Sequence, residues 1–349
     1  MKGYLKMKVN DFDFMLPEEL IAQSPTEKRD NSKLMVLNKI SGTIEHQHFY
    51  DILNYFDEND CLVLNETKVL PARLFGKKEI TNANIEILLL KELRKDVWEV
   101  LVKPAKRIKV GDSINFNDKL RATCLESFDD GIKTLELSYD GILIEILEEL
   151  GSLPLPPYIT KQLQEKDRYQ TVYAKDLGSA AAPTAGLHFT KEILDALAAK
   201  GVTIIPVTLH VGLGTFRPVS VDNVNDHEMH SESYYISEDS AKKLNQAVND
   251  KKNIIAVGTT SIRVLESNYN NGFTAGSFST NIFIYPGYKF KIVNELLTNF
   301  HLPKSSLIML VSALSSQEII MNAYLEAINN KYRFFSFGDA MFITTKEIK

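Results

Sequence analysis

The amino-acid sequence predicts an α/β (α+β mixed) domain that is interrupted by a small antiparallel β-barrel. Helix and strand patterns alternate before residue 69 and again after residue 151, whereas residues 69–139 hold short strand patterns separated by glycine and aspartate turns. Strands at such regular spacing are typical of a small barrel. Three of the four residues 154–157 are proline, and this stiff segment predicts a domain boundary.

The first α/β segment is predicted to open with a helix and to end with a buried strand. Pro17 suits the first turn of a helix, because its φ is already helical and its missing N–H would have no partner there. The pair Ser41-Gly42 lies between two strand patterns and predicts a hairpin. In order, the patterns predict a helix over residues 18–23, a hairpin over 34–45, a helix over 49–56 and a strand over 60–65.

The barrel and the second α/β segment follow from the same kind of pattern. The predicted barrel strands cover residues 84–90, 97–101, 107–110, 120–128 and 132–139, and a helix over 142–150 follows them. Beyond the boundary, Thr190 and Ser237 are expected to cap two helices. The remaining elements are helices over 191–200 and 238–249, strands over 202–209 and 254–257, and helices over 259–266, 305–315 and 318–330.

Composition and charge exclude several classes of function. The 349 residues carry a net charge of −5, which argues against a protein that coats DNA or binds membrane surfaces through cation density. The two cysteines, Cys61 and Cys124, lie in apolar strand patterns without C-x-x-C spacing, and no signal peptide is evident. The longest apolar runs are far shorter than a bilayer span. We therefore expect a soluble protein of the reducing cytoplasm.

Two blocks of small residues, 178–190 and 208–217, each contain a histidine and an aromatic residue. Neither has the period of an amphipathic helix or strand, and glycine costs backbone entropy, so we expect the backbone to approach a ligand closely here. The second block fails as a dinucleotide-binding fingerprint, because Pro218 follows, no helix begins there and the third glycine is missing. What remains is a loop in which Phe216 can stack on a flat ligand and Arg217 can bind an anion.

Five of the seven histidines lie after residue 187, which indicates one polar site. Any one of them alone is commonly a hydrogen-bonded structural residue, whereas the set together favours a site. Zinc is an alternative, but the H-x-x-H spacing of His227 and His230 lacks the one-turn offset of H-E-x-x-H, and no cysteine is near. Acid–base or hydrogen-bonding roles suit Glu228, His230 and Glu232 better. The five histidines are His188, His210, His227, His230 and His301.

The strand-to-helix unit around Gly258 offers a third part of a site. The hydroxyls of Thr259 and Thr260 and the free amides of a helix start suit a carboxylate or a phosphate. The alternative is an ordinary N-cap with an i,i+3 ion pair between Arg263 and Glu266.

Two more polar segments have alternative roles. In residues 298–303, Asn299 and His301 either satisfy backbone groups or line the site. Residues 103–109 contain a cluster of lysine and arginine, which is either a solvated face or a phosphate-binding site.

Segments along nearly the whole chain resemble the signature segments of the S-adenosylmethionine:tRNA ribosyltransferase-isomerases. The match includes the two small-residue blocks, as AAPTAGLHFT and TLHVGLGTFRPV, and it begins near Met7. Further matching segments are residues 64–74, 229–232, 258–263, 281–287, 297–305 and 332–341.

The resemblance implies a specific reaction and fold. Enzymes of this family move the ribosyl part of S-adenosylmethionine onto the aminomethyl group of 7-aminomethyl-7-deazaguanine at the tRNA wobble position. They isomerise it to an epoxycyclopentane, which gives epoxyqueuosine in tRNA and releases adenine and methionine. The implied fold is a discontinuous catalytic α/β domain, residues 1–68 and 152–349, with an inserted β-barrel domain at residues 69–151. The implied cosubstrate is S-adenosylmethionine, without a prosthetic group or a metal, and the implied partner is tRNA bound by a monomer.

This reaction requires a base beside the sulfonium, an acid for adenine departure and a polar cage around the amine and the sugar. The expected acid–base set is His188, His210, His230, Glu232 and His301. The expected nucleoside cradle is Gly212, Gly214, Thr215, Phe216 and Arg217, and the expected holders of the methionine carboxylate are Thr259, Thr260 and Arg263. Because the wobble nucleotide must leave the anticodon stack, we expect cations at its flanking phosphates, namely Arg73, Lys103, Lys106 and Arg107. Two other classes remain open: a tRNA methyltransferase, which would release S-adenosylhomocysteine, and a non-catalytic anticodon-binding protein.

Overall fold

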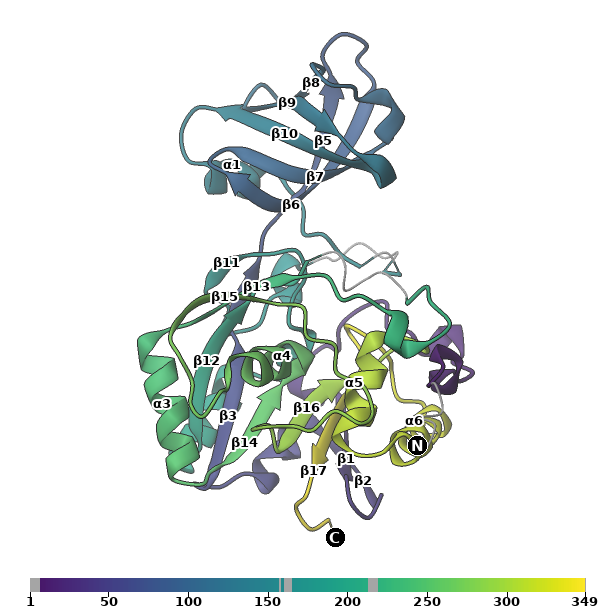
Figure 1. The fold of residues 1–349 in the computed structure, drawn as a ribbon, viewed down its shortest axis with the longest axis vertical. Coiled ribbons are helices and arrows are strands. Elements are labelled where there is room, and N and C mark those ends of the chain that lie inside the picture. The colour runs from purple at the N-terminus through teal and green to yellow at the C-terminus, as the bar shows by residue number, and fades with distance from the viewer. Residues whose placement is uncertain (1–6, 157, 160–164, 213–218, 349) are drawn as a thin grey trace, which may run out of the picture. The chain divides into compact units, whose positions relative to one another are not determined.

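The computed structural model describes residues 7–156, 158–159, 165–212 and 219–348. The chain divides into two compact units (Figure 1). The first, which we call the α/β unit, comprises Met1–Lys68, Pro157–Asp176 and Ala182–Lys349. The second, the barrel unit, comprises Val69–Pro156 and Leu177–Ala181. The predicted fold class, a mixed α/β fold with a small antiparallel barrel, is confirmed.

The barrel unit extends past residue 151, where we expected the inserted domain to end. Ser152 forms an antiparallel bridge with Arg73, with two N–O distances of 3.1 and 2.9 Å. The amide of Leu70 donates to the carbonyl of Ser179 at 2.9 Å, which attaches the short segment Leu177–Ala181 to the same unit. Backbone pairing at long sequence separation therefore sets this boundary, and the proline-rich composition does not reveal it.

The α/β unit is built on one nine-stranded sheet. Its four central strands β12, β3, β14 and β16 are parallel, so their carboxyl ends meet at one edge of the sheet. Strand β17 is antiparallel to β16, and β1 and β2 form the predicted hairpin beside it. In spatial order the strands are β15 (Gly276–Thr280), β13 (Glu232–Ile236), β12 (Thr203–Leu209), β3 (Asp60–Asn65), β14 (Asn253–Val257), β16 (Glu295–Asn299), β17 (Ala340–Thr344), β1 (Lys33–Asn38) and β2 (Ile44–His48).

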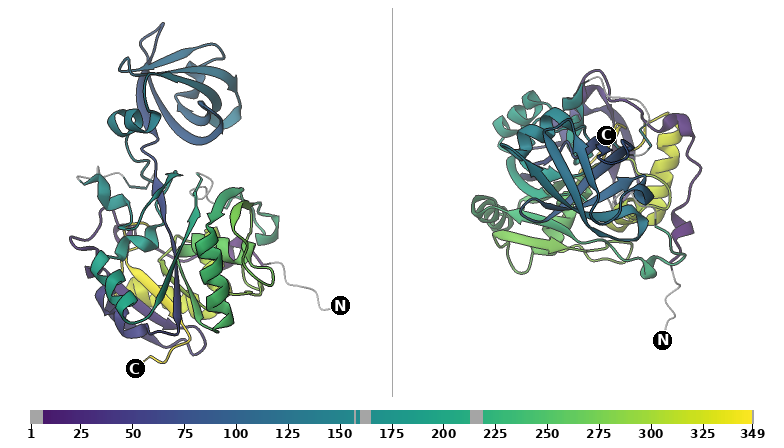
Figure 2. Two further views of the ribbon diagram at one scale, coloured as in Figure 1. Left: turned by 90° about the vertical axis from the view of Figure 1, so that its left-hand side faces the viewer. Right: turned by 90° about the horizontal axis from the view of Figure 1, so that it is seen from above.

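Helices cover both faces of this sheet. On one face, alternate strand residues such as Leu62 and Ile255 pack against Phe189, Ile193 and Leu197 in a fully apolar cluster. Figure 2 shows α2 and α3 on opposite sides of the sheet. Helix α4 also packs on the sheet, α5 packs against α4, and α6 packs against α5. The longer helices are η4 (Phe49–Tyr55), α2 (Lys191–Ala199), α3 (Glu238–Asn249), α4 (Gly258–Asn268), α5 (Ser306–Leu314) and α6 (Gln317–Asn329).

The barrel unit is a closed barrel of six antiparallel strands followed by one helix. Alternate residues face inward, as in β5, where Leu74 is buried between the exposed or half-exposed Arg73 and Phe75. The strands are β10 (Ile132–Tyr139), β7 (Val97–Lys103), β6 (Asn84–Arg94), β5 (Arg73–Lys78), β8 (Ser113–Phe116) and β9 (Leu120–Ser127), and the helix is α1 (Leu143–Leu150). A separate two-stranded sheet pairs β4 (Thr67–Val69) with β11 (Asp176–Ser179).

Two element predictions were wrong. Residues 107–110 were expected to form a strand, but Asp112 accepts hydrogen bonds from the Lys109 amide (2.7 Å) and from Lys78 Nζ (2.5 Å) and so closes a turn there. The helix expected over residues 18–23 stops after one turn, because Ile21 forms a parallel bridge with Phe334. The remaining short 3₁₀ turns are η1 (Val9–Phe12), η2 (Glu18–Leu20), η3 (Arg29–Asn31), η5 (Ala105–Arg107), η6 (Asp129–Gly131), η7 (Lys166–Tyr169), η8 (Thr184–His188) and η10 (Val224–Asp226).

The two predicted caps are confirmed. Thr190 Oγ1 accepts the amide of Ile193 at 3.2 Å, and Ser237 Oγ accepts the amide of Ser240 at 3.0 Å. Among the described residues, no single helix is long and apolar enough to cross a bilayer, and α5 and α6 reach that length and composition only as a pair bent by 116°.

Candidate functional site

Polar residues gather where the four parallel strands of the α/β unit end. Asn65 closes β3, His210 follows β12, Gly258 follows β14, and Asn299 closes β16. Open parallel sheets bind ligands at this edge, because the loops after the strands surround a common space. This edge therefore assembles residues from segments that lie far apart in the sequence.

Asn65 joins three of these segments. Its Nδ2 donates to the Leu209 carbonyl (3.0 Å) and to Thr260 Oγ1 (3.3 Å), and its Oδ1 accepts the amides of Leu209 (3.0 Å) and Thr67 (3.2 Å). The side chain is fully buried, so these bonds are shielded from water. Sequence reasoning did not select Asn65 as a site residue, although an amide side chain that ends a buried strand was the available signal.

His210 has one ring nitrogen oriented by the protein. Its Nδ1 lies 2.8 Å from Thr67 Oγ1, and that hydroxyl lies 3.4 Å from the carbonyl of Asp176. If Thr67 donates to the carbonyl, its oxygen accepts the Nδ1 hydrogen, and Nε2 becomes the basic nitrogen. Burial lowers the pKa of His210, and the Asp176 carboxylate partly opposes this shift. The ring is therefore neutral near pH 7 and able to accept a proton.

Asp176, which orients this pair, was also missed by the sequence reasoning. Its carboxylate accepts a hydrogen bond from Thr208 Oγ1 at 2.8 Å. Thr67 and Thr208 are both buried, and they bond to the backbone carbonyl and to the carboxylate of Asp176, respectively.

His188 is enclosed on all sides. Its Nδ1 lies 2.7 Å from Ser32 Oγ and its Nε2 lies 3.2 Å from Asn299 Nδ2, while the ring stacks on Phe49 at 5.1 Å. Because Asn299 Nδ2 donates, Nε2 is the acceptor and Nδ1 carries the hydrogen. Burial, together with the nearby charges of Arg333 and Arg29, lowers the pKa of His188 to about 3. Both ring nitrogens are engaged, which is the arrangement of a positioning residue.

His301 lies beside the same strand end and is also buried. Its Nε2 is 3.1 Å from Thr298 Oγ1, and its backbone amide donates to the Tyr324 hydroxyl at 3.0 Å. Burial lowers the pKa of His301 to about 3, so the imidazole stays neutral over the physiological range. Thr298 and His301 of the loop 298–303 thus contact each other at the edge of the site.

Glu232 and Arg263 form a buried ion pair. The second carboxylate oxygen of Glu232 accepts the Gly212 amide at 3.0 Å, and Arg263 also donates to the Thr280 carbonyl at 3.4 Å. Burial lowers the pKa of Arg263 to about 10. Breaking such a pair would leave an uncompensated buried charge, so each partner fixes the other.

The expected alternative, an ion pair between Arg263 and Glu266, is wrong. Glu266 is buried and accepts hydrogen bonds from the Tyr288 hydroxyl (3.0 Å) and from three backbone amides. These are the amides of Lys291 (2.9 Å), Ile292 (3.1 Å) and Val293 (3.0 Å). The carboxylate therefore anchors the segment before β16 instead of pairing with the cation one turn away.

A small pocket of about 20 Å³ lies at the start of α4. The N-cap residue Val257 forms no capping side-chain hydrogen bond, and helix-start amides of this kind suit an acceptor. Apolar side chains form the opposite wall, where His227 packs edge-on against Phe283 at 5.0 Å. The lining residues are Met229, Thr259, Thr260, Arg263, Ile282, Phe283, Ile284, Ser306, Leu307 and Leu310.

The remaining residues expected in the site are His230 and those of the glycine loop 212–217. His230 is exposed on the segment before β13. Gly212 is the last described residue before a gap, and Gly214, Thr215, Phe216 and Arg217 lie outside the described residues. In the ranges that the structure describes, no three histidine, cysteine or acidic side chains are grouped so that they could hold a metal ion.

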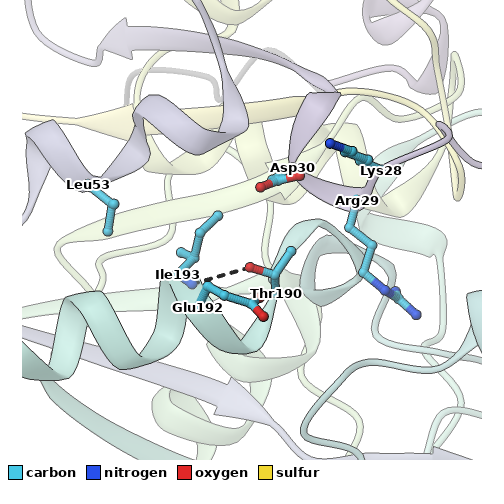
Figure 3. A pocket seen from close by; sticks show the side chains of 7 residues that line it. All are labelled: Lys28, Arg29, Asp30, Leu53, Thr190, Glu192 and Ile193. Atoms are coloured by element: carbon cyan, nitrogen blue, oxygen red, sulfur yellow. Dashed lines mark hydrogen bonds between the residues drawn. The ribbon is translucent and has the colours of Figure 1, made fainter.

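A second, open pocket of about 570 Å³ lies beside the start of α2 (Figure 3). Its polar groups are already engaged: Thr190 caps Ile193, and Arg29 donates to the carbonyls of Leu187 (3.1 Å) and Asp167 (2.9 Å). Lysine and arginine face aspartate and glutamate across it, so it has no dominant charge. None of the predicted site residues lines this pocket, whose lining is Lys28, Arg29, Asp30, Leu53, Thr190, Glu192 and Ile193.

The four expected phosphate contacts all lie in the barrel unit. Arg73 is half-buried on β5, with Nε 3.4 Å from Glu86 Oε1. Lys103, Lys106 and Arg107 are exposed at the end of β7 and in the turn that follows, and none of the three forms an ion pair with another described residue.

Comparison with known proteins identifies the family of the chain. The family model described as queuosine biosynthesis protein matches residues 9–343. The crystal structure of an S-adenosylmethionine tRNA ribosyltransferase from Thermotoga maritima is 37% identical in sequence, with a TM-score of 0.55. This similarity covers 95% of the present chain and 99% of the Thermotoga chain. The chain belongs to the queuosine biosynthesis protein family.

Proposed function

We propose that this protein transfers and isomerises the ribosyl part of S-adenosylmethionine onto 7-aminomethyl-7-deazaguanine at the wobble position of tRNA. The products are epoxyqueuosine in tRNA, adenine and methionine. Family membership and the Thermotoga ribosyltransferase support this reaction. The observation that carries it is the convergence of an oriented imidazole, a helix start and a buried ion pair at the carboxyl edge of one parallel sheet.

Within this proposal, His210 is the base that removes a proton beside the sulfonium. Three features support this role: the Nδ1 contact with Thr67, the lowered pKa, and its position at the end of β12. A base must be neutral to accept a proton, and a lowered pKa keeps the imidazole neutral at working pH. We propose that His188 and His301 act as positioning residues beside His210. Their burial keeps them neutral, and their ring nitrogens bond to neighbouring side chains.

His230 is the proposed acid for adenine departure. It is exposed two residues before Glu232, so it can exchange protons with solvent between turnovers. Glu232 acts through its contacts: one oxygen pairs with Arg263 and the other holds the Gly212 amide. We therefore propose that Glu232 positions the start of the glycine loop and that Arg263 holds this carboxylate in place.

The start of α4 is the proposed site of the methionine carboxylate of S-adenosylmethionine. The hydroxyls of Thr259 and Thr260 and the first amides of α4 suit that carboxylate. Gly212, Gly214, Thr215, Phe216 and Arg217 are the proposed cradle for the nucleoside.

The proposed tRNA contacts are Arg73, Lys103, Lys106 and Arg107. They form a local concentration of positive charge in a chain whose net charge is −5. Phosphate contacts of this kind give affinity and register without reading the base sequence.

One assay separates this proposal from its alternatives. The protein, radiolabelled S-adenosylmethionine and tRNA carrying 7-aminomethyl-7-deazaguanine should release adenine, and tRNA with guanine at the wobble position should not. A methyltransferase would release S-adenosylhomocysteine instead of adenine. A non-catalytic anticodon-binding protein would bind both RNAs and release neither product. Either of these outcomes would refute the proposed reaction.

A further inference from the structure

An aromatic side chain stands exposed on the outer face of the barrel unit. Phe75 lies in the middle of β5 and is 64% exposed, whereas Leu74 beside it is fully buried in the barrel. Exposed apolar side chains are common one at a time and need no explanation by themselves. The neighbours of Phe75 are what make it informative.

Phe75 is surrounded by cations on the same face. Arg73 and Lys77 lie two residues before and after it on β5, and side chains at that spacing share one face about 7 Å apart. Phe75 pairs with Glu86 on β6, and Glu86 pairs with Lys103 on β7, so these three stand in one row across the strands. Directly paired residues in such a row have side chains about 5 Å apart.

The charge around Phe75 is strongly positive. Glu86 contributes one carboxylate, and Arg73 Nε lies 3.4 Å from it. Lys77 and Lys103 are exposed and form no ion pair with any other described residue. The row then leads into the turn after β7, which adds the exposed cations Lys106, Arg107 and Lys109.

We propose that Phe75 is a stacking platform for an unpaired base of the tRNA loop, with Arg73, Lys77 and Lys103 holding the phosphates on either side. Unpaired RNA bases are bound by stacking on aromatic side chains, and the polyanionic backbone is held by cations beside them. This barrel surface offers an exposed aromatic ring and cations within a few ångströms of one another, which fits an unpaired RNA base and its flanking phosphates. This inference rests on the proposed function and adds a base contact to the phosphate contacts proposed there.

The second exposed phenylalanine of the barrel unit provides a matched control. Phe128 is 55% exposed at the turn between β9 and β10, and Asp129 and Asp130 follow it directly. Carboxylates repel an RNA backbone, so this surface lacks the charge complementarity of the Phe75 surface. If RNA bound to any exposed aromatic side chain, it would contact Phe128 as well as Phe75.

The test measures binding of the full-length protein to a fluorescently labelled anticodon stem-loop RNA by anisotropy over a range of salt concentrations. Phe75→Ala should raise Kd by about 5- to 100-fold with the same salt slope, because a stacking contact and no cation is lost. Phe75→Trp should bind as the wild type does, and Phe128→Ala should leave Kd unchanged. On a fully paired RNA duplex, Phe75→Ala should have no effect, because no base is free to stack.

The outcomes distinguish this inference from the proposed function. Wild-type affinity in Phe75→Ala, together with weaker binding in Lys103→Gln, would overturn the stacking role and leave the tRNA substrate in place. A loss of affinity for the duplex equal to that for the loop would also overturn it. Absence of RNA binding by the wild type would instead refute the proposed function. Unchanged circular dichroism of each variant verifies that the barrel is folded.

Discussion

At the scale of single residues, His210 is the side chain best placed to move a proton. Replacement by glutamine keeps a hydrogen-bonding group near Thr67 and removes the basic nitrogen. We expect His210→Gln to lower the single-turnover rate of adenine release by about 10²- to 10⁴-fold, with a smaller change in the Kd of S-adenosylmethionine. His46→Gln is the control. His46 lies on the β1–β2 hairpin, where its Nδ1 is 2.8 Å from the hydroxyl oxygen of Tyr332. An unchanged rate in His210→Gln would remove this residue from the mechanism.

The lowered pKa of His210 also predicts the pH profile. The neutral ring is the active form, so kcat/KM should fall as the pH drops through the pKa of His210. Because burial lowers that pKa, the midpoint should lie below the ordinary value of about 6.5. Thr67→Val, which removes the contact to Nδ1, should reduce the plateau rate because Nε2 is no longer favoured as the basic nitrogen. A midpoint above the ordinary histidine value contradicts the assignment.

His188 predicts how stability depends on pH. Its pKa is about 3 in the folded protein and about 6.5 in the unfolded chain, so below pH 6.5 only the unfolded chain takes up the proton. Its contribution to stability is therefore present above pH 6.5 and is lost as the pH falls toward 3, by up to about 1.4 kcal/mol per pH unit. Urea unfolding followed by circular dichroism at pH 7.5 and 5.5 should show this loss, and His188→Gln should reduce it. An equal loss in the variant would show that other groups carry it.

At the scale of elements, the 3₁₀ turn η8 is packed against the segment that precedes β11. A Cβ at Gly186 would lie 2.0 Å from the Tyr173 hydroxyl oxygen and 2.9 Å from a methyl carbon of Thr171. Gly186→Ala should therefore destabilise the protein by about 1–3 kcal/mol, the usual cost of overpacking. Tyr173→Phe removes the closest atom and should recover part of the loss in the double variant. Additive effects of the two changes, measured by urea unfolding, would contradict this contact.

The elements also show what the sequence could and could not predict. Strand 60–65 and the helix capped by Thr190 were predicted correctly. The spacing of apolar residues, the capping residue and the glycine that ends the helix are all local features of the sequence. The pairing of Arg263 with Glu232 could not be predicted, because the closer carboxylate of Glu266 is occupied by three amides from another segment. Asn65 was missed for a similar reason, since three of its four hydrogen bonds exist only once β3, β12 and α4 are assembled.

At the scale of the whole molecule, the distribution of charge matters more than its sum. The chain has a net charge of −5, yet the turn after β7 carries three exposed cations between residues 106 and 109. Each phosphate contact releases counterions, so the double change Lys106→Gln and Arg107→Gln should reduce the slope of log Kd against log salt by about 1.4 to 1.8. Lys242→Gln on α3 is the matched control, because it removes an exposed lysine from the other unit. A slope that stays constant in the double variant would remove these residues from the tRNA interface.

The division into two units has a consequence for how the protein can be dissected. The chain passes from one unit to the other after Lys68, Pro156, Asp176 and Ala181. A protease that cuts once at any of these crossings divides the chain into two fragments, which the non-covalent pairing of β3 with β12 and β14 holds together. Likewise, residues 69–156 alone do not make up the whole barrel unit. They lack the segment 177–181, in which the Ser179 carbonyl accepts a hydrogen bond from the Leu70 amide. Domain swaps between relatives should therefore carry both segments.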